Sequence, residues 1–385
     1  MPENAKPHLE LAERLVNQVL TPLKQTFVGK DEIIDLMGIC LVGGENLFML
    51  GPPGTAKSAL VQELGRLIDG RTFDYLLTRF TEPNELFGPF DIRRLREGEL
   101  VTNTDGMLPE ADLIFLDELL NANSAILNSL LLVLNERVFR RGRETRKLPV
   151  LMVTGASNHL PEDDSLQALF DRFLLRVHCD NVGNEQLHHV LSAGWELEQR
   201  ESLPKIGIQA SELAELQKAL RLVDMTGIRD TYMQVIRHLR HAGMAFSDRR
   251  AVKLQRLLAA SALLSGRTFA QESDMWVLRY TWDTLEQQEV IAGIVNEAIR
   301  EAPAQEQEHP RAREAERPSA EELASELESI DTRLQAVDVT GAELAVLKDR
   351  VRALAGRCEW VTQAEARDFL QEKLDATWRL IAEKV

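Results

Sequence analysis

A glycine-rich stretch between an apolar run and a helical pattern contains the residues whose types and spacing most clearly suggest chemistry. Residues 47–58 read LFMLGPPGTAKS. A strand, a glycine-rich loop and a helix N-terminus form a phosphate-binding loop, in which backbone N–H groups and the helix dipole face the phosphates. We expect Lys57 to reach the β- and γ-phosphates and the Ser58 hydroxyl to bind Mg²⁺. The residues expected to hold the nucleotide here are Gly51, Pro52, Pro53, Gly54, Thr55, Ala56, Lys57, Ser58 and Ala59.

Ala56 occupies a position where this loop pattern ordinarily has a third glycine. Alanine fits there if the residue keeps a negative φ, which is our expectation. The alternative interpretation is a Gly/Pro turn followed by a chance Lys-Ser pair. The strand before the loop and the helix after it favour the phosphate loop.

Two acids and an amide follow later apolar runs. Asp117 and Glu118 end the run LIFLDE, and Asn158 follows PVLMVTG-Ala-Ser. Ligands bind at the carboxyl ends of parallel strands, so Asp117 is expected to hold Mg²⁺ through its water shell and Glu118 to polarise the attacking water as general base. Asn158 could hydrogen-bond the γ-phosphate or the lytic water. The alternatives are an acidic helix N-cap for the acids and a turn residue for the amide.

These residues require a particular order of elements. Between residues 45 and 180, the short apolar runs NLFML, DYLLT, DLIFL, PVLMVTG and FLLRVH alternate with amphipathic stretches, which predicts an α/β fold with a parallel sheet. The predicted division is an N-terminal helix (1–26), an αβα core (27–200), an all-α lid (201–300), a Pro-rich charged linker (301–318) and a helical bundle or coiled-coil tail (319–385).

The composition of the chain disfavours nucleic-acid-binding and membrane proteins. The chain has 385 residues, a formal charge of −16 and three widely spaced cysteines. An acidic protein is poorly suited to general nucleic-acid binding or to an anionic membrane surface. The cysteines suit a reducing compartment, and no stretch approaches the apolar length of a membrane span. We therefore expect a cytoplasmic location.

Five motifs in order make the sequence resemble the MoxR family of AAA+ ATPases, and within it most closely the RavA subgroup of regulatory ATPases. GPPGTAKS resembles the Walker A motif, LIFLDE resembles Walker B, and TGASN resembles sensor 1. The segment LFDRF, with Arg172, resembles the arginine-finger motif, and SDRR, with Arg249, resembles sensor 2. The resemblance spans about residues 20–285. RavA-type proteins carry a further, non-helical domain within their helical tail, and we find no sequence for one in this chain.

The resemblance implies a Mg²⁺-dependent ATPase that assembles as a hexameric ring. It also implies a protein client, remodelled together with a partner that carries a von Willebrand A domain. Nucleotide would lie at the subunit junction, where Arg172 would enter the neighbour's site and Arg249 would sense the γ-phosphate from the lid. Arg250 is the alternative sensor 2 residue. Phe27, Val28 and Gly29 resemble the segment that packs on the adenine.

Two further segments resemble insertions of this family. One is the hairpin-like stretch 80–108, and the other is a hairpin over 138–148. The second hairpin and its flanks carry six basic residues, Arg137, Arg140, Arg141, Arg143, Arg146 and Lys147. They could meet phosphates, an acidic subunit or an acidic client, and a solvated hairpin is an equal alternative. Competing hypotheses for the whole chain are a nucleic-acid translocase and a nucleotide-gated assembly scaffold.

Overall fold

The structure is a computed structural model in which most of the chain is placed. It describes all residues except 1–5, 99, 142–143, 162, 184–185, 200–205, 304–306, 315–319, 336–346, 349, 352–353, 356–357, 359–363 and 384–385. The chain divides into two compact units, Met1–His309 and Pro310–Val385, and each is described by itself.

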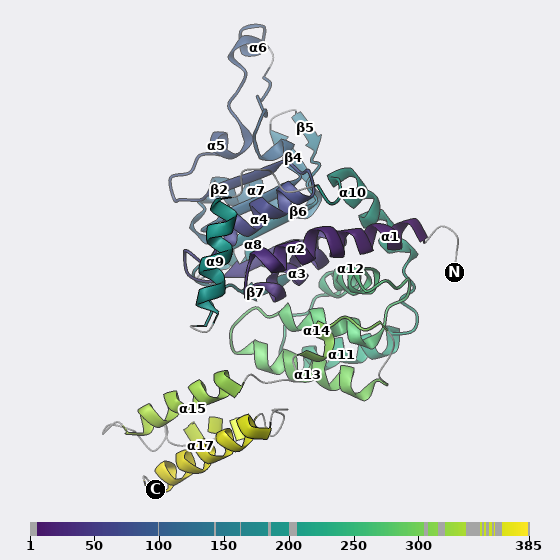
Figure 1. Ribbon diagram of the computed structural model, residues 1–385. Helices are drawn as coiled ribbons and strands as arrows, with labels where there is room; N and C mark the ends of the chain where they lie inside the picture. Colours follow the sequence, from purple (N-terminus) through teal and green to yellow (C-terminus); the bar gives the residue numbers. More distant parts are fainter. Residues whose placement is uncertain are drawn as a thin grey trace. The chain divides into compact units, whose positions relative to one another are not determined.

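A five-stranded parallel sheet forms the centre of the first unit (Figure 1). Its strand order is β2-β3-β6-β1-β7, so β1 pairs with both β6 and β7. The strands are β1 (Leu47–Leu50), β2 (Thr72–Leu76), β3 (Leu113–Asp117), β6 (Met152–Ser157) and β7 (Leu175–His178). All five apolar runs of the sequence are strands, and the predicted α/β fold with a parallel sheet is confirmed.

Helices cover this sheet because its strands are apolar on both faces. α3 (Asp31–Gly43) is buried on nearly all sides, as its sequence DEIIDLMGICLVG requires. α4 (Lys57–Leu67) connects β1 to β2, and α7 (Ser124–Glu136) follows β3. The Asn123 side chain caps α7 by accepting hydrogen bonds from the N–H groups of Ala125 and Ile126. The 3₁₀ turns η2 (Leu108–Glu110) and η3 (Leu119–Asn121) flank β3.

A helical rod precedes the core. It consists of α1 (Lys6–Leu15), the π-helical turn η1 (Val16–Leu20) and α2 (Thr21–Thr26). Leu15, Val19 and Leu23 are fully buried. The four-residue apolar spacing in this part of the sequence therefore marks the face that the rod packs against the rest of the unit.

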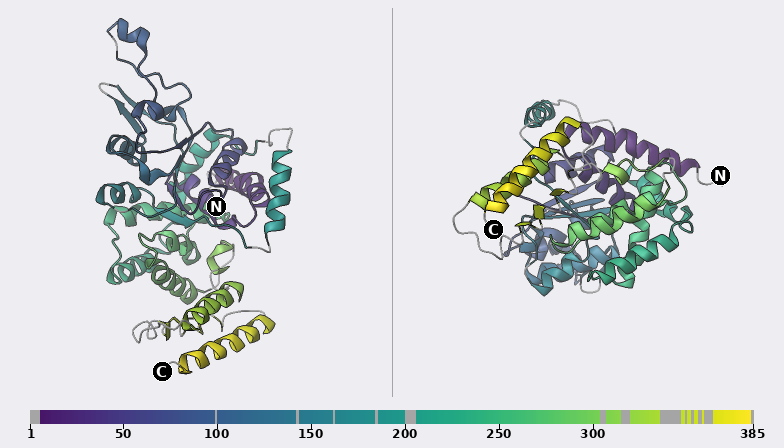
Figure 2. Two further views of the ribbon diagram at one scale, coloured as in Figure 1. Left: turned by 90° about the vertical axis from the view of Figure 1, so that its left-hand side faces the viewer. Right: turned by 90° about the horizontal axis from the view of Figure 1, so that it is seen from below.

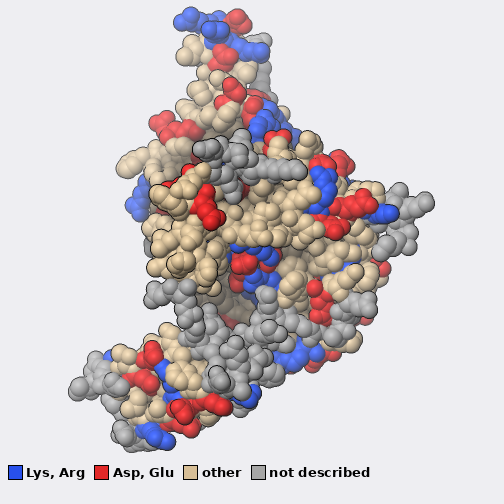
Figure 3. Space-filling model, viewed as in Figure 1, with Lys and Arg blue, Asp and Glu red and all other residues tan. Residues whose placement is uncertain are grey.

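The segment 80–108 extends away from the sheet (Figures 1 and 2). Its two arms run antiparallel, with the Asp91 N–H donating to Val101 O and the Asn103 N–H donating to Pro89 O, both at 2.8 Å. The hairpin-like path agrees with the expectation, but the segment carries the short helices α5 (Pro83–Phe87) and α6 (Ile92–Arg96). The tip, where α6 lies, carries the arginines of this helix together with acidic side chains (Figure 3).

Helices make up the rest of the first unit apart from the hairpin β4 (Val138–Arg141) and β5 (Glu144–Lys147). These helices are α8 (Asp164–Phe170), α9 (Leu187–Glu198), α10 (Ala210–Ala219), η4 (Leu220–Leu222), α11 (Arg229–His241), α12 (Asp248–Leu264), η5 (Glu272–Tyr280) and α13 (Gln287–Glu301). One fully buried ion pair lies in this region, with Arg267 binding Asp274 through two nitrogens at 2.7 and 2.9 Å.

The second unit contains α14 (Arg311–Glu314), α15 (Ala320–Gln335) and α17 (Ala364–Glu383). α15 and α17 share an apolar core that includes Leu323, Leu327, Leu370 and Leu374. These two helices agree with the expected helical tail. Between them, part of the chain lies outside the described residues, but Leu347, Val351 and Leu354 are helical and belong to the same core.

The Arg267–Asp274 pair provides a stability test. Arg267→Met leaves the Asp274 carboxylate buried without its cation, which costs about 3–5 kcal/mol of unfolding free energy. Burial already raises the pKa of Asp274, and loss of Arg267 raises it further. Because a raised carboxyl pKa favours the neutral buried form at low pH, we expect the deficit to be smaller at pH 5 than at pH 7.

Urea unfolding at the two pH values measures this effect. Lys218→Met is the matched control, because it breaks the exposed pair with Glu215 and should change stability by no more than about 0.5 kcal/mol. Equal losses for the two variants would contradict the assigned role of the buried pair.

Candidate nucleotide site

The loop between β1 and α4 has the shape of a phosphate cradle. The Gly51 N–H donates to Ser157 O at 2.9 Å, so the loop begins as a continuation of the sheet. A Cβ on Gly51 would lie 2.2 Å from Cys179 O, and Gly54 has a φ of +83°, so both positions require glycine. Lys57 Nζ donates to the carbonyl oxygens of Gly51 and Pro52 at 2.9 and 2.8 Å. The lysine charge therefore lies inside the curve of the loop.

The expectation for Ala56 was wrong. Its φ is +65°, in the left-handed region, and not negative. The loop must reverse direction immediately before α4 so that successive N–H groups point inward, and the third position of the pattern is glycine in most such loops for this reason. Alanine adopts this conformation at a cost of about 1–2 kcal/mol.

The acids and the amide lie where the neighbouring strands end. β3 ends at Asp117, β1 at Leu50 and β6 at Ser157, all at one edge of the sheet. Glu118 has a φ of +49°, and its N–H donates to Asp117 Oδ1 at 3.0 Å. The turn exposes part of both carboxylates, and Asn158 follows β6 as an exposed residue. The structure thus brings Lys57, Ser58, Asp117, Glu118 and Asn158 to the same edge.

The donor set fits Mg²⁺. No group of three or more His, Cys, Asp or Glu side chains converges anywhere in the described part of the chain, so a cage made of protein ligands alone is absent there. Mg²⁺ instead uses one or two protein oxygens together with phosphate and water. The half-exposed carboxylate of Asp117 and the hydroxyl of Ser58, on the first turn of α4, provide hard oxygen ligands of this kind.

The residues expected beside the adenine lie near the same edge. Phe27 ends α2 as a buried residue, and Gly29 has a φ of +71°. A Cβ on Gly29 would meet Val182 and Gln186, which follow β7. The Lys30 ammonium donates to Asp180 O. Phe27, Val28 and Gly29 thus form a wall next to the chain that leaves β7 beyond the phosphate loop.

Arg172 lies at the opposite edge of the sheet. It precedes β7, and its carbonyl accepts a hydrogen bond from Asn46 Nδ2 at 2.8 Å. Asn46 immediately precedes β1, whereas the phosphate loop follows β1. Since the strands are parallel and four residues span about 13 Å, Arg172 is separated from the phosphate loop of its own chain by the length of the sheet. Its Nε is buried without a hydrogen-bond partner.

Arg249 lies beside Arg172 at this second edge. Both line a cavity of about 470 Å³. Arg249 Nη2 donates to Asn135 Oδ1 at 3.2 Å, near the end of α7, and the preceding Leu134 carbonyl accepts from Asn46. The end of α7 is therefore next to the start of β1, which places Arg249 away from the phosphate loop of its own chain.

Arg250 has a different environment. It pairs with Asp283 at 2.9 Å, and Asp283 also accepts from Arg176 of β7 at 2.6 Å. Burial, together with the nearby Arg250 charge and against the opposing effect of Asp283, lowers the pKa of Arg176 to about 9. This cluster, which we name the lid clamp (Arg176, Arg250 and Asp283), fixes α12 against β7. Arg250 is thereby committed to the clamp, while Arg249 is exposed.

The sequence analysis missed the lid clamp. A signal was present, because Arg176 is a charged residue inside the apolar strand run FLLRVH. Such a residue predicts a buried partner. The sequence around Asp283 does not indicate that this residue is the partner, because an acidic residue in a loop after a helix is common.

The basic residues around β4 and β5 have separate roles. Arg141 donates to Gly88 O at 2.8 Å and Arg146 donates to Thr104 Oγ1 at 2.8 Å, so these two hold the segment 80–108. Arg140 is exposed, and Arg143 lies outside the described residues. Arg137 and Lys147 both line another cavity.

Comparison with known families agrees with this geometry. The family described as the MoxR domain in the MoxR-vWA-beta-propeller ternary systems matches residues 13–218, and an AAA lid domain matches residues 223–295. The chain belongs to the MoxR family of AAA+ proteins. The AAA lid match covers α11, α12 and η5, and it includes Arg249 and two of the three lid-clamp residues, Arg250 of α12 and Asp283 after η5.

Individual proteins resemble this chain at sequence identities of 35% or less. An uncharacterized protein of Methanocaldococcus jannaschii is 35% identical over 70% of this chain and 71% of its own length. The chaperone MoxR1 of Mycobacterium tuberculosis is 24% identical over 54% of each chain. The crystal structure of a candidate ATPase from Cytophaga hutchinsonii superposes with a TM-score of 0.63 at 17% identity, covering 79% of this chain and 99% of the other. That structural likeness shows the shared fold.

Within the described residues, no helix combines the length and the apolar character that crossing a bilayer requires.

The left-handed conformation of Ala56 predicts the effect of substitutions there. Ala56→Gly removes the strain and should leave nucleotide affinity unchanged or slightly higher. Ala56→Val places a β-branched side chain at positive φ, and we expect at least a roughly tenfold loss of affinity because the loop must change shape. Titration with a fluorescent ADP analogue compares the variants. Equal affinity for Val and Gly variants would contradict the described loop conformation.

Proposed function

We propose that this MoxR protein hydrolyses ATP at the edge of the sheet where β1, β3 and β6 end. The observation that supports this most strongly is the convergence of Lys57, Ser58, Asp117 and Glu118 at that edge. A phosphate-binding loop beside an acid pair has the parts needed for phosphoryl transfer to water. Membership in the MoxR family supports the same chemistry.

In the proposed mechanism each residue has one task. The loop N–H groups and Lys57 hold the β- and γ-phosphates, and Ser58 and Asp117 would hold Mg²⁺, which would supply charge neutralisation. Glu118 accepts a proton from the attacking water, and Asn158 orients that water or the γ-phosphate. Phe27, Val28 and Gly29 contact the adenine.

The position of the arginines favours a ring of subunits. Arg172 and Arg249 lie at the edge away from the phosphate loop of their own chain and line one cavity. They are therefore suited to act on nucleotide bound by a neighbouring subunit, with Arg172 as the arginine finger and Arg249 as sensor 2. A finger supplied by a neighbour contributes about 10³- to 10⁵-fold in rate. A hexameric ring is the assembly that we propose, with the domain division given by the sequence.

The proposed client is a protein, and the proposed partner carries a von Willebrand A domain. The matched family is named for ternary systems that contain such a domain, and one relative is named a chaperone. The segment 80–108 offers exposed apolar side chains, including Phe80, Ile92 and Leu100, beside the arginines of α6. A surface that combines exposed apolar and basic side chains is suited to binding a polypeptide. Placement in the RavA subgroup rests on the SDRR motif and the helical tail.

Glu118→Gln tests the proposed chemistry. The variant retains shape and hydrogen bonding but cannot accept a proton, so we expect the hydrolysis rate to fall at least about 100-fold while ATP affinity changes little. Steady-state phosphate release and nucleotide titration measure the two quantities. Glu136→Gln, at an exposed position at the end of α7, is the matched control and should behave as wild type.

If Glu118→Gln hydrolysed ATP at more than half the wild-type rate, Glu118 would not be the general base. If this variant lost hydrolysis but supported full function in cells, the nucleotide-gated scaffold would replace the remodelling motor.

A nucleic-acid motor is the second candidate because Arg93 and Arg96 are exposed on α6. Stimulation of hydrolysis by single-stranded DNA or RNA, with a steep dependence on salt, would support it. The net charge of −16 favours a protein client.

A further inference from the structure

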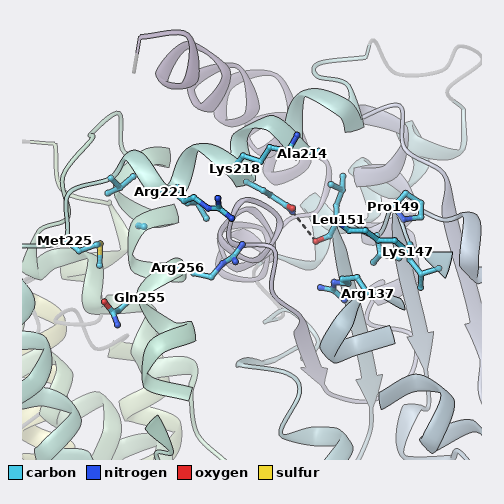
Figure 4. A pocket seen from close by; sticks show the side chains of 16 residues that line it. Arg137, Lys147, Pro149, Leu151, Ala214, Lys218, Arg221, Met225, Gln255 and Arg256 are labelled. Carbon is cyan, nitrogen blue, oxygen red and sulfur yellow. Dashed lines mark hydrogen bonds between the residues drawn. The ribbon is translucent and has the colours of Figure 1, made fainter. Parts of the chain in front are cut away.

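A second cavity, of about 560 Å³, lies between the core and the helices of the lid (Figure 4). Its walls come from three parts of the first unit: the end of α7 and β5 with the chain up to β6, the connecting elements α10 and η4, and α12 of the lid. The volume is in the range of pockets that hold small molecules. No step of the proposed hydrolysis uses this cavity.

The charge of the lining is uniformly positive. Its five charged members are all basic: Arg137, Lys147, Lys218, Arg221 and Arg256. None of the described lining residues is acidic, although the protein as a whole carries a formal charge of −16. Figure 4 shows Arg221 and Arg256 reaching in from one side and Arg137 from the other, with their guanidinium groups directed at the space between them.

Two of these arginines are held in position by backbone carbonyls. Arg256 Nε donates to Gly43 O at 3.0 Å and Arg137 Nη2 donates to Gly44 O at 3.3 Å, so both contact the C-terminal end of α3. The negative end of the α3 dipole therefore stabilises both guanidinium groups through one N–H group each. The other N–H groups of the two arginines do not contact these carbonyls and could bind a ligand.

One nitrogen of Arg137 has no hydrogen-bond partner. This atom, Nη1, is buried. Burial, opposed by Glu45 and reinforced by the charge of Arg256, lowers the pKa of Arg137 to about 10. The Glu45 carboxylate is itself bound by Lys253 at 2.9 Å. The guanidinium groups of Arg137 and Arg256 thus line one cavity between core and lid, and the Nη1 group of Arg137 has no acceptor. A bound anion would provide that acceptor.

The other part of the lining is apolar. Leu148, Val150, Leu220 and Val223 contribute buried side chains, and Met225 lies among them. An inorganic ion would leave this surface without a partner, and an extended acidic peptide would need an open groove. We propose that the cavity binds a small organic polyanion, an apolar or aromatic body with two or more carboxylate or phosphate groups. Because the walls belong to core and lid, its binding would hold the two together.

Calorimetric titration with benzene-1,2,4,5-tetracarboxylate tests this proposal on the full-length protein. The probe is a flat ring with four carboxylates, and it lacks the phosphates that the loop at Lys57 recognises. The test variant is Arg221→Gln with Lys147→Gln, because both side chains are exposed and neither contacts α3 in the structure. We expect this double variant to bind at least about tenfold more weakly than wild type, since two charge-assisted contacts are lost.

Two controls make the result specific. Arg237→Gln with Lys6→Gln removes the same charge at exposed positions elsewhere and should bind within about twofold of wild type, because distant surface charges act only through screened fields. Lys57→Ala should also bind the probe as wild type. Equal weakening in both double variants would overturn the proposal, as would loss of binding in Lys57→Ala or no binding by the wild type. Tighter binding of a poly-glutamate peptide than of the probe would overturn it too, in favour of an acidic protein segment.

Discussion

The parallel direction of β1, β6 and β7 is the constraint on which the rest of the site depends. Parallel pairing sends every strand end to one edge and every strand start to the other. The phosphate loop follows β1 and is therefore at the first edge. Arg172 precedes β7 and is therefore at the second. Under the proposed function, the phosphate loop and Arg172 are two halves of a hydrolytic site at opposite edges of one chain, and assembly with another copy would bring such halves together.

The lid clamp extends this constraint to the lid. Asp283 binds Arg176 of the sheet and Arg250 of α12, so the start of α12 is fixed against β7. Lys253 and Arg256 then bind residues just before β1 along the same helix. The clamp therefore keeps Arg249 at the second edge, next to Arg172. Because the clamp ties the start of α12 to β7, Arg249 of the lid and Arg172 of the core are held together on one surface of the chain.

The strands and the phosphate loop could be predicted from the sequence because local patterns determine them. Apolar runs bounded by turn residues marked all five strands, and Gly51 and Gly54 stand where no side chain fits. The φ of Ala56 could not be predicted, because propensity favours negative φ while closure of the loop on α4 imposes a positive value. The short helices within 80–108 depend on tertiary contacts such as Arg141 with Gly88 O.

The position of Arg249 also escaped prediction, since motif order along the chain does not tell which edge a lid helix will cover. The proximity of Arg137 and Arg256 also depends on tertiary packing. They are 119 positions apart in the numbering, and they meet because the residue that ends α7 and the helix α12 both contact the C-terminal end of α3.

Mixing two inactive variants tests the central claim that each site is completed by a neighbour. Glu118→Gln retains Arg172 but lacks the base, and Arg172→Ala retains the base but lacks the finger. If the arginine acts between subunits, an equimolar mixture should recover ATPase activity, up to about a quarter of the wild-type rate for random assembly around a ring of head-to-tail interfaces. Activity in the mixture no higher than the mean of the separate variants would contradict the account.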